Sequence, residues 1–122
     1  MKALISSIAI ITLVLALSVI NMCFVTSFAD EMIEIIEKTP QTTALFSRDS
    51  MADFFDRWEE KRDLIALSVN FDYINEAERA AYEMYFCGLS DGDSDYLDAK
   101  AQLISSLRVI RDVETFSFYN II

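Results

Sequence analysis

The N-terminal quarter of the chain is a single apolar run without a charge. No Asp, Glu, Lys or Arg occurs from position 3 to position 29, a stretch of 27 residues. As a helix this stretch would be about 40 Å long, whereas the hydrocarbon core of a bilayer is about 30 Å thick. The pattern therefore predicts a transmembrane anchor over residues 1–29 that contacts membrane lipid and either tilts or emerges on one side.

The helical periodicity continues where the charges begin. Residues 32–36 extend an apolar stripe between charged positions, which predicts a juxtamembrane extension of the same helix over residues 30–39. Proline disfavours helical geometry at the residue before it and has no N–H group, so Thr39-Pro40 should break or kink this helix. Residues 41–47 are then expected to form a connector.

Three further stretches place apolar residues at intervals of three and four, the spacing of one helix face. The first should begin near Ser47, Asp49 or Ser50, each a possible N-cap. Ser50 and Asp53 resemble a weak capping box, and the stretch should run to about Val69. Its apolar face includes Trp58, which is therefore expected to be a core residue. The second follows a turn at residues 70–72, with Asp72 or Asn75 as its cap.

The third stretch follows a break at residues 88–92 and opens at Asp93 or Ser94. The residues expected on its inner side are Tyr96, Lys100, Leu103, Ile104, Leu107 and Ile110. Residues 115–122 are apolar and β-prone but have no partner strand, so we expect them to lie back across the bundle. An exposed docking tail is the alternative for this segment.

These elements define the predicted fold. Two glycines and one proline are too few for a many-stranded sheet, and short loops favour antiparallel neighbouring helices. The predicted class is all-α: an N-terminal transmembrane helix extended beyond the membrane, followed by a small antiparallel three-helix bundle over residues 40–122. The extended helix is a candidate for a fourth side of this bundle.

The charges on either side of the apolar run predict its orientation. Lys2 precedes the run, whereas Asp30, Glu31 and Glu34 follow it. The positive-inside tendency places the N-terminus in the cytoplasm and the bundle outside. The chain is therefore expected to be a single-pass protein of the cell membrane. A cleaved secretory signal is the competing interpretation, because residues 27–29 (Ser-Phe-Ala) have the small-x-small spacing of a cleavage site. The run is much longer than an ordinary signal h-region, which favours the anchor.

The exported part is strongly acidic. From Asp30 onward it has 20 acidic and nine basic residues, a net charge of −11. Such a surface repels nucleic acid and anionic lipid headgroups, so nucleic-acid binding is not expected. It leaves open a cationic partner, a metal ion or simple solubility beside a membrane.

No catalytic, cofactor-binding or metal-binding residue is predicted. The chain has no histidine, the commonest catalytic base and metal ligand, and it has no Gly-rich phosphate loop or cysteine pair at metal spacing. Asp91, Asp93 and Asp95 resemble the opening of a calcium loop, but Tyr96 and Gln102 occupy the positions that require Gly and Glu. A helix start rich in acids is the simpler interpretation.

The acidic residues near the second helix and the two cysteines are expected to have structural roles. The five acidic residues of the second stretch recur at helical spacing and are expected to form a solvated face away from Trp58: Asp49, Asp53, Asp56, Glu60 and Asp63. Cys23 and Cys87 lie on different parts of the chain, so no disulfide framework is expected, and Cys87 is interpreted as a buried small hydrophobe.

The order of these features resembles a family of unknown function: short, N-terminally membrane-anchored helical proteins of clostridial Firmicutes. The resemblance is carried by the anchor, by DRWEEK at residues 56–61, by VNFDYI at residues 69–74 and by NII at residues 120–122. The chain has Asn70 and Phe71 where that family often has a histidine. The resemblance implies the fold and the location, and it implies no activity.

These observations lead to one functional expectation and one alternative. The chain is expected to be a non-enzymatic, membrane-anchored interaction module of the bacterial cell envelope, with another envelope protein as its partner. The alternative is a sensor-like module that binds a ligand or a cation between its helices.

Overall fold

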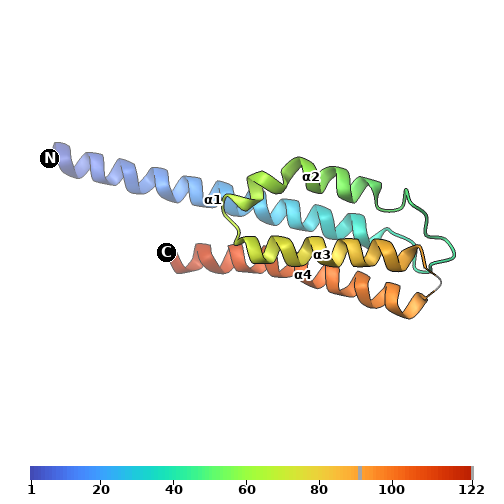
Figure 1. The fold of residues 1–122 in the computed structure, drawn as a ribbon. Coiled ribbons are helices and arrows are strands. Elements are labelled where there is room, and N and C mark those ends of the chain that lie inside the picture. Colours follow the sequence, from blue (N-terminus) through green and yellow to red (C-terminus); the bar gives the residue numbers. More distant parts are fainter. Residues whose placement is uncertain (91, 122) are drawn as a thin grey trace.

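A computed structural model describes the backbone of residues 1–90 and 92–121 and the side chains of residues 1–90 and 92–113. This part of the chain contains four helices and no strand: α1 (Lys2–Glu37), α2 (Ala52–Ala66), α3 (Phe71–Gly88) and α4 (Asp93–Ile121). Successive helices run in opposite directions, and the first half of α1 projects beyond the other three (Figure 1). The predicted all-α class with a long N-terminal apolar helix is confirmed.

α1 has two halves with different surroundings. Its first half is apolar and exposed, with Leu4, Leu13 and Ile20 each more than half accessible. Its second half enters the core through Val25, Phe28, Ala29, Met32, Ile33 and Ile36. α1 packs against both α4 and α2, so it forms the fourth side of the bundle. One unbroken helix therefore joins an uncovered apolar segment to a folded core.

The core is contributed by all four helices. α2 buries Phe54, Trp58 and Ile65, and α3 buries mainly small residues, including Ala77, Ala80 and Ala81. These alanines let α3 approach α4 closely, and this pair is the most extensively packed in the structure. α4 buries Tyr96, Ala99, Lys100, Leu103, Leu107 and Ile110, so five of the six residues predicted for its inner side are buried. Each large apolar side chain removed from water contributes about 1.5–3 kcal/mol.

The connector after α1 is held by the start of α4. α1 ends at Glu37, as the Thr39-Pro40 pair predicted, and Thr39 Oγ1 donates to Ile36 O at 2.6 Å. Tyr96 donates its hydroxyl to Pro40 O at 2.5 Å. Lys100 Nζ donates to Thr39 O at 3.2 Å. The bonds from Tyr96 and Lys100 give the connector carbonyl groups of Pro40 and Thr39 a partner, which backbone acceptors need away from water.

Two predicted helix caps are wrong. α2 begins at Ala52 and has no side-chain cap, because Ser50 Oγ accepts from the backbone N–H of Ser47 at 2.9 Å instead. α3 is capped by Asn70, whose side chain accepts from the backbone N–H of Asp72 at 2.9 Å. Asn70 is a good cap, since its short carboxamide reaches the orphan N–H groups of the first turn.

The prediction for residues 115–122 is also wrong for its backbone. Residues 115–121 continue α4 as a helix, and Figure 1 shows this end running on past the α2–α3 turn without folding back. A helical segment continuing a long helix keeps its backbone bonds, whereas a turn would break them. Ile122 and the side chains after Val113 lie outside the described residues.

Candidate functional site

The strongest candidate for a binding site is an open groove between α1 and α2, with a volume of about 450 Å³. Five carboxylates and two cations line it around Ile35: Glu31, Glu34, Asp53, Asp56 and Glu60, with Lys38 and Arg57. We call this feature the acidic groove. Its formal charge is −3, so it attracts a cationic group.

The acidic groove results from two helical repeats placed side by side. Glu31 and Glu34 are three residues apart on α1, and Asp53, Asp56 and Glu60 follow intervals of three and four on α2. Residues at these intervals share one helix face. The antiparallel packing of α1 and α2 turns both acidic faces toward the same opening.

Salt bridges occupy part of the acidic groove. Arg57 Nε lies 3.5 Å from Glu31 Oε1 and links α2 to α1. Lys38 Nζ lies 2.9 Å from Glu34 Oε1, and this contact lowers the pKa of Glu34 through its hydrogen bond and charge and raises the pKa of Lys38 for the same reasons. Within the described chain, Asp53 and Asp56 form neither a hydrogen bond nor an ion pair. They remain available to a partner.

The acidic groove offers carboxylates to a cationic group. Four of them are exposed and Glu31 is half-buried, so a single ion pair at an exposed carboxylate contributes at most about 1 kcal/mol, and several must act together. The sequence has no histidine, the commonest catalytic base. Among the described residues, no three His, Cys, Asp or Glu side chains gather in a way that could hold a metal ion.

The five acids predicted to form a solvated face of the second helix are all exposed. Three of them, Asp53, Asp56 and Glu60, line the acidic groove, whereas Asp49 and Asp63 do not. Glu31 and Glu34, which line the groove from α1, belong to the predicted juxtamembrane extension over residues 30–39. Sequence spacing could not reveal the groove, because it forms only when α1 and α2 pack together.

Asp93 at the start of α4 has a structural role. Asp93 Oδ1 accepts from Thr43 Oγ1 at 2.6 Å and from Thr43 N at 2.9 Å. These two bonds lower the pKa of Asp93 and attach the connector to α4. Asp95 lies at a separate shallow surface with Asp98 and Glu83, and Asp91 lies outside the described residues.

Trp58 is a core residue, as predicted, with 3% of its surface exposed. Its ring lies between Phe28, 5.7 Å away, and Phe54, 5.8 Å away and stacked. Its Nε1 donates to Glu78 Oε1 at 2.8 Å, and Arg62 Nε donates to the same oxygen. Glu78 thereby satisfies the indole N–H and joins α2 to α3, a role that no sequence pattern indicated.

The two cysteines are free thiols on different surfaces. Cys23 is exposed on α1, and Cys87 is partly buried on α3. Desolvation, with the charges of Asp95 and Glu83, raises the pKa of Cys87. A raised pKa leaves less thiolate at neutral pH, so Cys87 is a packing residue and a poor nucleophile.

Comparisons with known proteins add no further information on this arrangement. The sequence matches no protein-family model and no curated protein, and the fold matches no solved structure.

Proposed function

We propose that this chain is a membrane-anchored, non-enzymatic helical module that meets another protein of the bacterial cell envelope at its acidic groove. The observation that carries the proposal is the continuity of α1. Among the described residues, α1 is the one helix that is long and apolar enough to cross a membrane. None of its most apolar segment is buried. Its second half belongs to the core.

The core residues of α1 favour a permanent anchor over a cleaved signal. Cleavage before Asp30 would remove Val25, Phe28 and Ala29, which are at most 2% exposed. Deleting one large buried side chain costs about 2–5 kcal/mol, and a small domain has only about 5–15 kcal/mol of stability. A chain that begins at Asp30 would therefore lose much of its fold.

The charge step along the chain favours an external bundle. Lys2 lies before the uncharged run and the acidic bundle lies after it. The proposed topology has the N-terminus in the cytoplasm, a single span, and the bundle on the outer face of the cell membrane. The acidic groove would then face extracytoplasmic partners.

The proposed partner carries a cationic segment. Asp53 and Asp56 are exposed and unpaired in the described chain, so a lysine or arginine side chain can reach them without breaking an existing bridge. Opposite charges across an interface raise the association rate and suppress wrong partners more than they raise affinity. The interaction should therefore weaken with added salt.

Affinity capture from membranes tests this proposal. The full chain should retain one envelope protein that the double variant Asp53→Lys/Asp56→Lys does not retain. Glu59→Lys/Asp98→Lys is the matched control, since it makes the same charge change at exposed residues outside the acidic groove and should capture the same protein. Equal capture by both double variants would rule out the groove as the contact surface.

A further inference from the structure

The α2–α3 turn exposes large apolar side chains. Leu64, Leu67 and Phe71 are 56%, 84% and 52% exposed. Arg62 lies over the Phe71 ring, 5.1 Å from its centroid, and leaves most of the three side chains uncovered. Three large apolar side chains exposed together at one end of the bundle are unfavourable in water. Such a patch indicates a contact with an apolar surface.

Two contacts fix the position of this turn along α1. Trp58 lies beside Phe28, and Lys61 Nζ lies 5.9 Å from the ring of Phe24. Since α2 runs antiparallel to α1, the residues after Lys61 lie beside α1 residues before Phe24. Leu64 and Leu67 are thus placed next to the uncharged run. Figure 1 shows the α2–α3 turn beside the point where the first half of α1 leaves the bundle.

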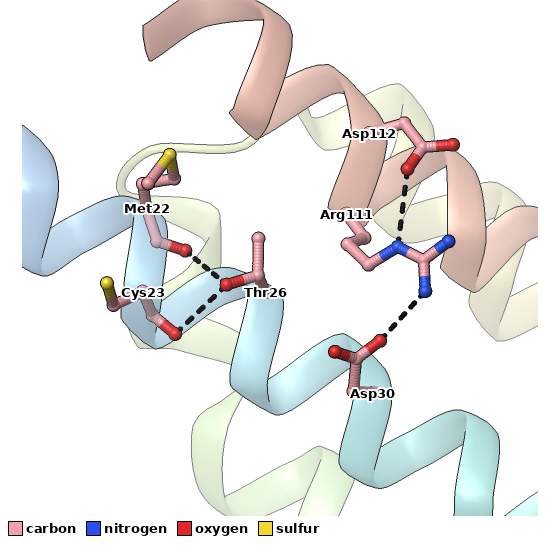
Figure 2. Close-up of polar contacts among 6 residues, drawn as sticks. All are labelled: Met22, Cys23, Thr26, Asp30, Arg111 and Asp112. Carbon is pink, nitrogen blue, oxygen red and sulfur yellow. Dashed lines mark hydrogen bonds and ion pairs between the residues drawn. The ribbon is translucent and has the colours of Figure 1, made fainter.

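The end of α4 reaches the same level. Arg111 Nη1 lies 2.9 Å from Asp30 Oδ1, and Arg111 Nε lies 3.2 Å from Asp112 Oδ1 (Figure 2). Asp30 is the first charged residue after the uncharged run. Beyond Arg111, α4 continues for ten residues, or about 15 Å, and residues 115–121 carry no charge. Figure 1 shows this end passing the α2–α3 turn toward the free half of α1.

Three hydroxyl groups of the uncharged run donate to backbone carbonyl groups of α1 itself. Ser7 Oγ donates to Ala3 O, and Ser18 Oγ donates to Val14 O, both at 2.9 Å. Thr26 Oγ1 donates to Met22 O at 2.8 Å and to Cys23 O at 3.2 Å (Figure 2). Polar groups that bond to their own helix can enter an apolar medium, where unsatisfied ones cannot.

We infer that the membrane-proximal end of the bundle, formed by Leu64, Leu67, Phe71 and residues 115–121, inserts shallowly into the outer surface of the bilayer that α1 crosses. The inference rests on the proposed anchoring by α1. The observation that carries it is that the exposed apolar side chains at the end of α2 and the start of α3, and the uncharged end of α4, all lie beside the same part of α1. A lipid surface requires this common level, whereas a contact with a second copy of the chain does not.

Asp72 sets the depth of insertion. It lies in the first turn of α3 next to Phe71, and it is exposed. A carboxylate is costly in the hydrocarbon core, so the turn lies among the headgroups and only its apolar side chains point to the acyl chains. Phe71 and the other exposed groups then act like the interfacial residues of membrane proteins.

Quenching of tryptophan fluorescence by brominated lipids tests the inference on the full chain in phosphatidylcholine vesicles. Three variants each add one tryptophan: Leu67→Trp at the turn, Leu13→Trp in the uncharged run, and Leu45→Trp, which is 75% exposed at the opposite end of the bundle. Trp58 is present in all of them, and the wild type supplies its background. Exposed positions 67 and 45 can accept the larger ring without disturbing the core.

The inference predicts a specific pattern. Leu67→Trp should be quenched most by bromines placed near the headgroups, Leu13→Trp by bromines deeper in the acyl chains, and Leu45→Trp by neither. Quenching of Leu13→Trp alone would overturn the inference and leave the anchor intact. Absence of quenching in all three variants would overturn both the inference and the proposed membrane anchor. A Leu67→Trp emission that is shielded from acrylamide but not quenched by lipid would show that a second copy covers the turn, which also overturns the inference.

Discussion

Phe28 of α1 and Trp58 of α2 lie with their ring centroids 5.7 Å apart and their planes inclined by 30°. Phe28 belongs to the uncharged run at the N-terminus, and Trp58 is the central aromatic residue of α2. The contact therefore joins the apolar segment to the folded core. Together with the other buried residues of α1, it makes the end of the apolar run part of the bundle.

Trp58→Ala should destabilise the protein strongly. Removing a large buried aromatic side chain costs about 3–5 kcal/mol, and the change also leaves Glu78 without its indole donor. Denaturant unfolding of the detergent-solubilised chain, followed by circular dichroism, measures the loss. Asp53→Lys is the comparison and should change the free energy of unfolding by no more than about 0.5 kcal/mol, because Asp53 is exposed. The reverse ranking would mean that α2 presents the opposite face to the core.

Two truncations should differ sharply in stability. A chain that begins at Phe24 keeps the buried residues Val25, Phe28 and Ala29, whereas a chain that begins at Asp30 lacks them. The longer chain should unfold cooperatively, and the shorter one should have a much lower Tm or no cooperative transition. Calorimetry in the same detergent measures both. Equal stability would revive cleavage after Ala29 as an interpretation.

Gly88→Ala should destabilise the protein, although alanine normally favours a helix by about 1 kcal/mol over glycine. A Cβ atom at position 88 would lie 2.5 Å from two ring atoms of Phe46. That ring is buried and packs edge-on against Tyr96, with centroids 5.2 Å apart, so it has little room to move. Overpacking of this kind costs about 1–3 kcal/mol, measurable as a lower urea midpoint. Restoring space with Phe46→Leu in the same chain should recover part of the loss.

The Asp93–Thr43 contact should make stability depend on acid pH. Two hydrogen bonds from Thr43 hold the pKa of Asp93 below its ordinary value of 3.8. The unfolded chain therefore takes up this proton first as pH falls. The stabilisation is complete above pH 3.8 and is lost as pH falls through the lower, folded pKa. Asp93→Asn should remove this part of the acid dependence of Tm, while Asp98→Asn should not.

The proposed topology predicts the response to external protease. Protease added to intact protoplasts should digest the bundle and leave the N-terminus, with Lys2, protected in the cytoplasm. Full protection of the bundle would instead require the opposite orientation. Release of a soluble fragment that begins at Asp30, before any protease is added, would identify residues 1–29 as a cleaved signal.

Much of the fold could be predicted because its signals are local. The charge-free run, the Thr39-Pro40 break and the periodic apolar residues of α4 each depend on neighbours within a few turns. The caps of α2 and α3 were less accessible, since several Ser, Asp and Asn residues compete near each helix start and tertiary contacts decide among them. Ser50, for example, bonds to Ser47 instead of capping α2.

The acidic groove and the Glu78 contact could not be predicted, because both join residues that are distant in sequence. Glu31 and Asp56 line the same groove only because α1 packs on α2. Glu78 has the same charge and helical setting as its exposed neighbours, and only the structure shows that it accepts from Trp58. Gly88 likewise has the sequence signal of a helix end, while its close approach to Phe46 is a tertiary fact.

Under the proposed anchoring, the unbroken helical backbone of α1 also fixes the distance between the acidic groove and the membrane. With the outer boundary of the hydrocarbon near Met22, the groove residues Glu31 to Lys38 stand about 14–24 Å above it. No glycine or proline between these points acts as a hinge. A cationic partner segment anchored in the same membrane would need a spacer long enough to cover this distance. A tilt of the span would move the groove with it as one rigid body.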